Sequence, residues 1–401
     1  AAALGREMGW SRVAERYLEV CREVVKEGRR AAVAVKPPRA TLPEVRLDHL
    51  RLLTDDVGII QHATFGIPDR AHGYSADDVG RALAVVCRLW EEVPRSEARR
   101  RLLPLATTYL AFLHHAQTEA GHFHNFMGYD RRFLDARGSE DTLGRVVWGL
   151  GWAVRVAPTE GIRELASRLL EAARPHLQAT RPLRARAYAL CGLTATRDPA
   201  WQGLVRRLAD GLCDAFEATA SDDWPWFEES LTYGNAKLCE ALLHAHRRTG
   251  EGRYRDIALR ALDHLTAVQL KRGPGGESRF DLVGNRGWCR RGGTPAVYDQ
   301  QPIDAGYLVE AYVMAHQVTG EERYMELAHT AFEWFLGRNR LGEPLYDFRT
   351  GACCDGLEEG RINRNQGAES TLCFLLALLA LGHRRVPDAP AAGRGRRPAA
   401  E

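Results

Sequence analysis

Carboxylates stand beside aromatic or polar residues at the start of five helix-like segments, GYSADDVGRAL (73–83), GSEDTLGRVVWGL (138–150), WPWFEESLTYGNAKL (224–238), YDQQPIDAGYLVEA (298–311) and NQGAESTLCF (365–374). The acids are Asp77, Asp78, Glu140, Asp141, Glu228, Glu229, Asp304 and Glu369. A single acid in a first helical turn indicates capping, which contributes about 0.3–1 kcal/mol. If the five helices run parallel, however, their acids meet at one end. A set of acids that repel one another is typical of a site for a polar ligand or for catalysis.

Two of these segments also place an arginine one turn after an acid, at Asp78 and Arg81 and at Asp141 and Arg145. This spacing is that of an ordinary ion pair within a helix. It also suits a general base, because the guanidinium favours the deprotonated carboxylate. Both interpretations stay open for Asp78 and Asp141.

The segment 224–238 combines flat apolar and directional polar groups, namely Trp224, Trp226, Phe227, Glu228, Glu229, Tyr233 and Asn235. Sugars present C–H faces that stack on aromatic rings and hydroxyls that bond to acids and amides. Among these rings, desolvation would raise the pKa of Glu228 or Glu229, and we expect one of them to be a general acid. The two tryptophans are equally compatible with the core.

The predicted loops supply further binding candidates, which are His62, His124, Asn125, Trp288, Gln300, Asp355 and Asn365. His122 and His124 are spaced like metal ligands but lack supporting carboxylates in register. We interpret Cys289, Cys353 and Cys354 as buried thiols rather than as a zinc site. No metal and no other cofactor is expected.

Apolar residues recur at helical spacing along almost the whole chain, which predicts an all-α protein. Twelve helices are expected, at 10–28, 77–91, 97–117, 140–154, 159–175, 183–195, 199–219, 228–248, 252–270, 302–318, 321–337 and 367–382. Amphipathic helices alternate with helices that are apolar nearly all round, as in an (α/α)6 toroid with six outer and six inner helices. The long loops 118–139, 271–301 and 338–366 precede inner helices, so we expect the site at the inner-helix N-terminal end. The expected organisation is an N-terminal helix and linker (1–45), the toroid (46–384) and a disordered tail (385–401).

The composition excludes several classes of protein. The 401 residues are 45% hydrophobic and 27% charged, with a net charge of +3, as in a soluble globular chain. Its cations are mostly arginines scattered along helix faces, which argues against a nucleic-acid partner. Nine cysteines without a CxxC pair indicate reduced thiols and a cytoplasmic location. Neither a membrane span nor a signal peptide is predicted, and the missing initiator Met suggests a processed, truncated or excised chain.

Five stretches in succession, DDVGIIQHATFGIPDRAHGYSADDVGRAL, HNFMGYDRRFLDARGSEDTLGRVVWGLG, WFEESLTYGNAKLCEALL, YDQQPIDAG and CCDGL with NRNQGAEST, carry a family resemblance. Residues 43–384 resemble a bacterial family of six-hairpin, glycosidase-like modules that occur beside or fused to family 4 glycosyltransferases. The resemblance implies an (α/α)6 fold, a carbohydrate ligand and acid or base roles for Asp78, Asp141, Glu228 and Glu229. The opening GWSRVAERYLEV looks like the last helix of such a glycosyltransferase, which implies a partner or fusion. Ser75 and Val79 depart from the family's GYC and DDNAR.

These observations predict a glycoside hydrolase, or a phosphorylase using the same site, acting on an oligosaccharide or polysaccharide. Glycosidic cleavage needs one protonated and one ionised carboxylate, and inversion is favoured because acids on different helices are well separated. A non-catalytic glycan-binding module that assists a glycosyltransferase is the alternative from a different class. A sugar epimerase or lyase is a third possibility, with Tyr233, His62 or His124 as the base.

Overall fold

A computed structural model describes residues 18–19, 41–93, 97–156, 158–273 and 276–382. The chain divides into two compact units, residues 1–41 and 42–401, and the fold described here is that of the second unit. Most of the predicted helix 10–28 and all of the predicted tail 385–401 lie outside the described residues.

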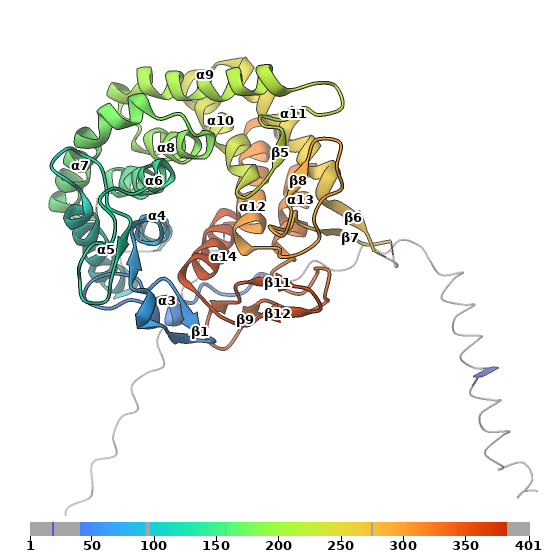
Figure 1. Ribbon diagram of the computed structural model, residues 1–401, viewed down its shortest axis with the longest axis horizontal. Helices are drawn as coiled ribbons and strands as arrows, with labels where there is room; N and C mark the ends of the chain where they lie inside the picture. The colour runs from blue at the N-terminus through green and yellow to red at the C-terminus, as the bar shows by residue number, and fades with distance from the viewer. Residues whose placement is uncertain (1–17, 20–40, 94–96, 157, 274–275, 383–401) are drawn as a thin grey trace, which may run out of the picture. The chain divides into compact units, whose positions relative to one another are not determined.

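Six inner helices form a closed ring, in which each helix packs on the next and the last packs on the first (Figure 1). They are α4 (Ala76–Glu92), α6 (Glu140–Val156), α8 (Leu183–Thr196), α10 (Asn235–Thr249), α12 (Pro302–Thr319) and α14 (Ala368–Ala380). These helices are apolar on nearly every side because each is surrounded by other elements. In α14, for example, every residue from Ala368 to Leu379 is buried except Glu369. The predicted (α/α)6 toroid is therefore confirmed.

Outer helices cover the ring and run opposite to the inner ones. They are α5 (Glu97–Ala116), α7 (Glu160–Ala179), α9 (Gln202–Thr219), α11 (Gly252–Gln269) and α13 (Glu322–Phe332). In α7, Thr159 caps the first turn by accepting from the Ile162 amide, and the buried residues recur every three or four positions. Within the described residues, the short helix α3 (Asp48–Leu53) packs on α14 where a sixth outer helix would lie.

Glycines let the inner helices α4, α6 and α8 approach one another backbone to backbone. A Cβ on Gly149 would lie 2.3 Å from the carbonyl oxygen of Gly80, and one on Gly151 would lie 2.0 Å from that of Gly192. These separations are too short for any side chain. The run GRVVWGLGWAV therefore owes its glycines to helix packing and not to a turn.

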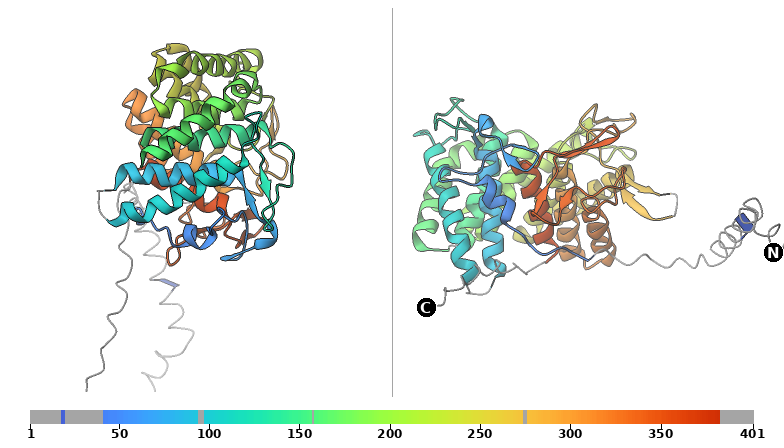
Figure 2. Two further views of the ribbon diagram at one scale, coloured as in Figure 1. Left: turned by 90° about the vertical axis from the view of Figure 1, so that its left-hand side faces the viewer. Right: turned by 90° about the horizontal axis from the view of Figure 1, so that it is seen from below.

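Short antiparallel hairpins connect the long loops at the N-terminal end of the inner helices (Figure 2). The paired strands are β1 (Ala63–Thr64) with β2 (Ile67–Pro68), β3 (Tyr74–Ser75) with β4 (Phe126–Met127), β5 (Ser230–Leu231) with β8 (Cys289–Arg290), β6 (Leu270–Arg272) with β7 (Ser278–Phe280), β9 (Tyr346–Asp347) with β10 (Ala352–Cys353), and β11 (Gly356–Glu358) with β12 (Arg361–Asn363). Two of these pairs join different loops and so fix the loops relative to one another. The sequence did not predict these strands, because two or three residues are too few to show alternation.

The helix predicted at 228–248 begins later than expected, at Asn235. Residues Ser230–Leu231 pair with β8 instead, and Gly234 adopts a left-handed conformation (φ 59°) immediately before the helix. Glu228 and Glu229 consequently lie in a loop. The prediction that they begin an inner helix is wrong.

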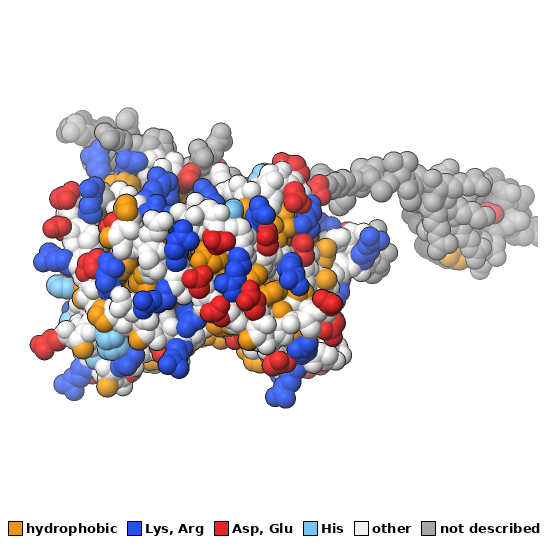
Figure 3. Space-filling model, turned by 90° about the horizontal axis from the view of Figure 1, so that it is seen from above, with side chains coloured by type: hydrophobic (Ala, Val, Ile, Leu, Met, Phe, Trp, Pro, Cys, Tyr) orange, Lys and Arg blue, Asp and Glu red, His pale blue; other side chains and the backbone are white. Residues whose placement is uncertain are grey.

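The surface over α9 carries interspersed basic and acidic side chains, without a field of one sign (Figure 3). None of the described helices combines the length and the apolar character that a membrane span requires.

Candidate functional site

Charged and phenolic side chains gather where the inner helices begin, and we call this group the axial cluster. Five members come from the first two inner helices, namely Asp77, Asp78 and Arg81 of α4 and Asp141 and Arg145 of α6. The others are Tyr233 from the loop before α10, Asp304 and Tyr307 of α12, and Glu369 of α14. Contacts and electrostatic interactions link them into one group, as the sequence predicted for Asp78, Asp141, Asp304 and Glu369.

Arg81 pairs with two acids that are far apart in the sequence, Asp78 and Glu369. Its side chain is 2% exposed, its Nη1 lies 2.7 Å from Asp78 Oδ1, and its Nη2 pairs with Glu369 Oε2. The Ser75 hydroxyl donates to the other oxygen of Asp78 at 2.7 Å. Burial raises the pKa of Asp78 to about 6 and outweighs the opposing effect of Arg81. Arg81 therefore does not lower the pKa of Asp78 below its usual range, and the role of Asp78 as a general base stays a prediction.

Arg145 reaches across to the neighbouring helix. Its Nη1 lies 2.9 Å from Asp77 Oδ2, whereas its Nη2 is 3.9 Å from Asp141 of its own helix. The guanidinium also lies over the ring of Tyr188, 4.7 Å from the centroid. Asp141 Oδ2 accepts a hydrogen bond from the Tyr233 hydroxyl.

The pKa of the Asp304 carboxyl is raised further than that of Asp78. Asp304 is 5% exposed, and its Oδ1 accepts the Gly234 amide at 2.8 Å. Burial raises the pKa of Asp304 to about 7, against the lowering effect of that amide. This carboxyl therefore keeps its proton to a higher pH than an exposed aspartate does.

Several buried polar atoms of the cluster have no hydrogen-bond partner among the described residues. They are Asp77 Oδ1, Arg81 Nε, Arg145 Nε, Asp304 Oδ2 and the Tyr307 hydroxyl. Each such group costs about 1–3 kcal/mol unless it finds a partner. A polar, hydroxyl-rich ligand or ordered water would supply those partners.

The two predicted general acids lie at the edge of this cluster. Glu228 faces Arg184, whose Nη1 is 2.9 and 3.0 Å from its two oxygens, and its side chain is 32% exposed. Glu229 is 69% exposed and lies 3.7 Å from Arg291. Neither side chain has the apolar surroundings that were expected, because each is partly or mostly exposed and faces an arginine.

The predicted aromatic platform is part of the core. Trp226 is fully buried against Phe227, and Trp224 packs on His264 while its Nε1 donates to the Glu228 carbonyl at 2.8 Å. Trp288 is half-buried and packs against the core. The expectation that Trp224 and Trp226 line a binding surface is therefore wrong.

Four predicted binding residues hold the fold together. Gln300 is fully buried between Asp281 and Trp334, and Asn125 accepts the Asp77 amide at 3.2 Å. Glu140 accepts the Arg181 amide at 3.0 Å, and Asn235 accepts the Thr232 amide at 3.0 Å. These contacts anchor the loops from which the cluster is built.

The remaining candidates surround the start of α14 or the loop beside it. Asp355 accepts from the Gly367 amide (2.8 Å) and the Ser370 hydroxyl (2.7 Å), and it interacts electrostatically with Glu369 and His62. Asn365 accepts the Phe65 amide at 3.0 Å. His62 is exposed and contacts His72 edge-on, with ring centroids 4.5 Å apart.

His124 lies on a different loop. Its Nδ1 is 2.6 Å from the Asp135 carbonyl oxygen, and its ring stacks on Phe133.

Sequence reasoning missed Arg184 and Tyr307. Arg184 begins α8, is 6% exposed, and donates to the Tyr233 carbonyl at 2.6 Å and to Thr232 at 2.7 Å. Tyr307 lies one turn after Asp304 on α12, a helix whose residues from Pro302 to Ala315 are all buried. A polar side chain on a fully buried helix is the signal that would have identified both.

Neither a family model nor a curated protein matches the sequence. Solved structures match the fold. A D-mannose isomerase superimposes with a TM-score of 0.63 at 16% identity, over 83% of this chain and 93% of that one. The cellobiose 2-epimerase of Bacillus thermoamylovorans gives 0.62 at 13% identity, over 82% and 94%. The family 76 α-mannanase of Bacteroides thetaiotaomicron gives 0.54 at 10% identity, over 84% and 93%.

At these identities the matches establish the six-hairpin, glycosidase-like fold of this chain. They agree with the fold that the sequence resemblance implied. They do not test the association with a glycosyltransferase.

Proposed function

We propose that the protein is a carbohydrate-active enzyme that cleaves a glycosidic bond at the axial cluster, by hydrolysis or phosphorolysis. The observation that carries this proposal is Asp304, a carboxyl that keeps its proton near neutrality, within a group of carboxylates held by arginines. Glycosidic cleavage needs such a pair, with one acid to protonate the leaving oxygen and one carboxylate to activate the nucleophile.

In this proposal Asp304 is the general acid and Glu369 the general base. Asp304 Oδ2 has no partner among the described residues and is free to donate its proton. Glu369 is the most exposed ion-paired acid of the cluster, at 43%, and it pairs with Arg81. Asp141, held by Tyr233 and Arg145, is the second candidate for the base, and Asp78 shares Arg81 with Glu369.

We further propose that the reaction inverts the anomeric centre. Asp304 and Glu369 begin the neighbouring helices α12 and α14, and packed helices are about 8–10 Å apart. Inverting enzymes separate their carboxyls by about 6.5–9.5 Å, which leaves room for water or phosphate.

A sugar isomerase or epimerase is the second candidate. The fold match to a D-mannose isomerase and to cellobiose 2-epimerases favours it. Such chemistry needs a base beside a carbon next to a carbonyl, and the bonded pair of Tyr233 and Asp141 is the group in the cluster that could provide one.

Two further proposals concern the setting of the enzyme. The sequence resemblance supports a role beside a glycosyltransferase. The eight cysteines among the described residues are all free and buried, which supports a cytoplasmic location.

Product analysis distinguishes these candidates. The protein is incubated with an oligosaccharide panel with and without phosphate, and separately with D-mannose and cellobiose in D₂O. We expect cleavage that falls by about 10² or more in Asp304→Asn and in Glu369→Gln, but not in the exposed control Glu229→Gln. Deuterium incorporation into a free sugar without cleavage would establish the isomerase class instead. Tight glycan binding without turnover would show a binding module and overturn the proposal.

A further inference from the structure

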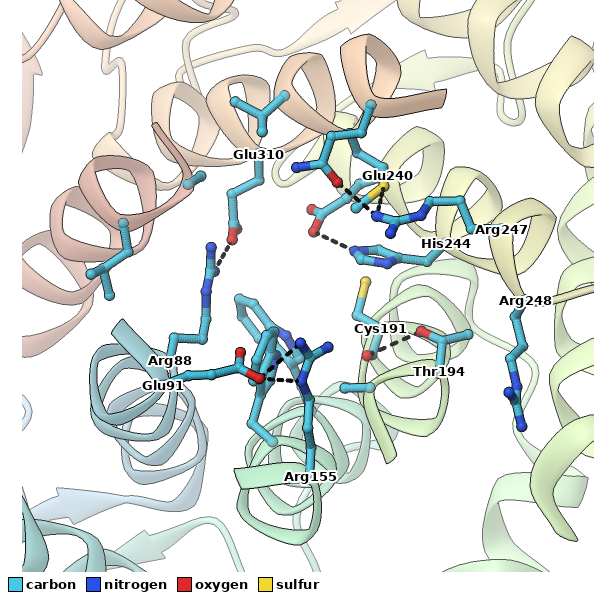
Figure 4. A pocket seen from close by; sticks show the side chains of 18 of the residues that line it. Arg88, Glu91, Arg155, Cys191, Thr194, Glu240, His244, Arg247, Arg248 and Glu310 are labelled. Atoms are coloured by element: carbon cyan, nitrogen blue, oxygen red, sulfur yellow. Dashed lines mark hydrogen bonds and ion pairs between the residues drawn. The ribbon is translucent and has the colours of Figure 1, made fainter. Parts of the chain in front are cut away.

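A cavity of about 540 Å³ opens at the opposite end of the ring, among the C-terminal halves of the inner helices (Figure 4). Its wall includes Arg88, Glu91, Arg155, Cys191, Glu240 and His244. None of these residues belongs to the axial cluster. The proposed chemistry leaves this cavity without a role.

Three side chains of different chemistry converge in this cavity. Cys191 comes from α8, while Glu240 and His244 lie four residues apart on one face of α10. Their potential ligand atoms all lie within 4.8 Å of one another. Figure 4 labels the three residues, which lie side by side at the cavity. Cys191 and Glu240 are 2% and 4% exposed, and His244 faces the cavity.

The spacing of these atoms suits a tetrahedral metal ion. His244 Nε2 lies 3.5 Å from Glu240 Oε1. Two ligands bonded at about 2.0–2.1 Å and at the tetrahedral angle are about 3.4 Å apart. The two atoms are thus separated as they would be on one ion, and the Cys191 sulfur lies within 4.8 Å of both.

Buried charges fix the orientation of the Glu240 carboxylate. Lys237 Nζ lies 2.6 Å from Glu240 Oε2 and 2.9 Å from Glu310 Oε2, so Oε1 is the oxygen that faces His244. Partners of this kind orient metal ligands in many proteins.

The cavity wall carries charges of both signs. Glu240 and Glu310 pair with Lys237 and Arg88, and the rest of the wall adds the arginines Arg155, Arg197, Arg247 and Arg248 and the acids Glu91 and Glu92. The C-terminal ends of the inner helices, which carry partial negative charge, point toward this side of the ring.

We propose that Cys191, Glu240 and His244 form a binding site for a zinc-class divalent ion. The ion displaces the thiol proton, binds the Cys191 thiolate, the neutral His244 imidazole and one Glu240 oxygen, and leaves a fourth position open to the cavity. This site could not be predicted from the sequence, because its ligands come from two helices and lack a metal motif.

Zinc itself is the probe. Tag-free protein is stripped with a chelator and titrated with Zn²⁺ against a competing chromophoric chelator, and its metal content is then analysed. In a separate measurement, bound Co²⁺ reports a thiolate ligand by its near-ultraviolet charge-transfer absorption. We expect one equivalent with 1:1 stoichiometry. Cys191→Ser and His244→Gln each remove a ligand and should lower the affinity for Zn²⁺. The loss should exceed the factor of about 10 to 100 that removal of a residue supporting a ligand costs.

Two matched controls keep the test interpretable. Cys213→Ser changes another buried cysteine, on outer helix α9, and His246→Gln changes a histidine of α10 that faces the Glu251 carbonyl. Both should retain the full affinity. Absence of saturable binding, or equal affinity in all four variants, would overturn the site. The result is independent of the proposed function, because binding is read without a sugar substrate.

Discussion

Arg145 Nη1 lies 2.9 Å from Asp77 Oδ2 on the neighbouring helix α4, while its Nη2 is 3.9 Å from Asp141 on its own helix. The ion pair therefore joins two inner helices rather than two turns of one. It also leaves Asp141 to accept the hydroxyl of Tyr233, which comes from a third part of the chain. The start of the ring is thus held together by side chains that are distant in sequence.

The pH dependence of turnover should report the general acid. Because burial raises the pKa of Asp304 to about 7, we expect kcat/KM to fall as the pH rises through about 7, where this carboxyl loses its proton. In Asp304→Asn the residual rate should no longer show this alkaline decline. Initial rates measured from pH 5 to 9 check this, and a wild-type profile flat to pH 9 would exclude Asp304 as the acid.

The same carboxyl should affect the free energy of unfolding. Its pKa is raised from 3.8 to about 7 on folding, so between about pH 4 and 7 the native state binds more protons than the unfolded state. Stability from this group is present at low pH and is lost as the pH rises through that window. We expect denaturant unfolding to show that the free energy of unfolding of Asp304→Asn, relative to wild type, is higher at pH 8 than at pH 4.5. The exposed variant Glu229→Gln provides the baseline for comparison.

Removing Arg81 should be costly. The Arg81→Met variant leaves Asp78, which is 7% exposed, without its buried cation, and we expect a loss of about 3–5 kcal/mol in the free energy of unfolding. The loss should be larger at pH 8 than at pH 5, since the pKa of Asp78 is already raised to about 6 and would rise further.

The control for this experiment is Arg131→Met. Arg131 pairs with Asp56 at 2.7 Å, but both side chains are mostly exposed, and solvent screening leaves such pairs with little effect on stability. Equal losses in the two variants would contradict a special role for the buried pair.

Two glycine substitutions should have opposite effects. Gly151→Ala places a Cβ 2.0 Å from the Gly192 carbonyl and should destabilise the protein by at least about 1–3 kcal/mol, as overpacking does. Gly161→Ala on the outer helix α7 meets no atom within 4 Å and should stabilise it by about 0.4–1 kcal/mol. Thermal unfolding of both variants provides the measurement. A tolerated Gly151→Ala would mean that α6 and α8 can separate.

The helix order and the ring could be predicted from the sequence because hydrophobic periodicity distinguishes helices that face solvent from those that do not. The convergence of Asp78, Asp141, Asp304 and Glu369 followed from that arrangement. The loop before α10 could not be predicted in the same way. The pairing of Ser230–Leu231 with Cys289–Arg290 depends on residues far along the chain, and it moves the helix start from 228 to Asn235.

The partners of the charged groups were equally hidden. An arginine four residues after an acid predicts a pair within one helix, yet the close packing at Gly80 and Gly149 brings Asp77 within reach of Arg145. Burial, which sequence spacing does not report, sets the sign of the shift at Asp78. The same limitation concealed the cavity at Cys191 and His244.

The centre of the ring is filled, and this has a consequence for how a polymer could be handled. Fully buried Lys237 lies 4.1 and 4.0 Å from the ring centroids of Trp148 and Tyr307, so packed side chains separate the axial cluster from the cavity at the far end. In the proposed function, a sugar chain bound at the axial cluster therefore cannot thread through the toroid to the far cavity. We expect substrate and product to enter and leave on the same side of the ring, so that each product competes there with the next chain.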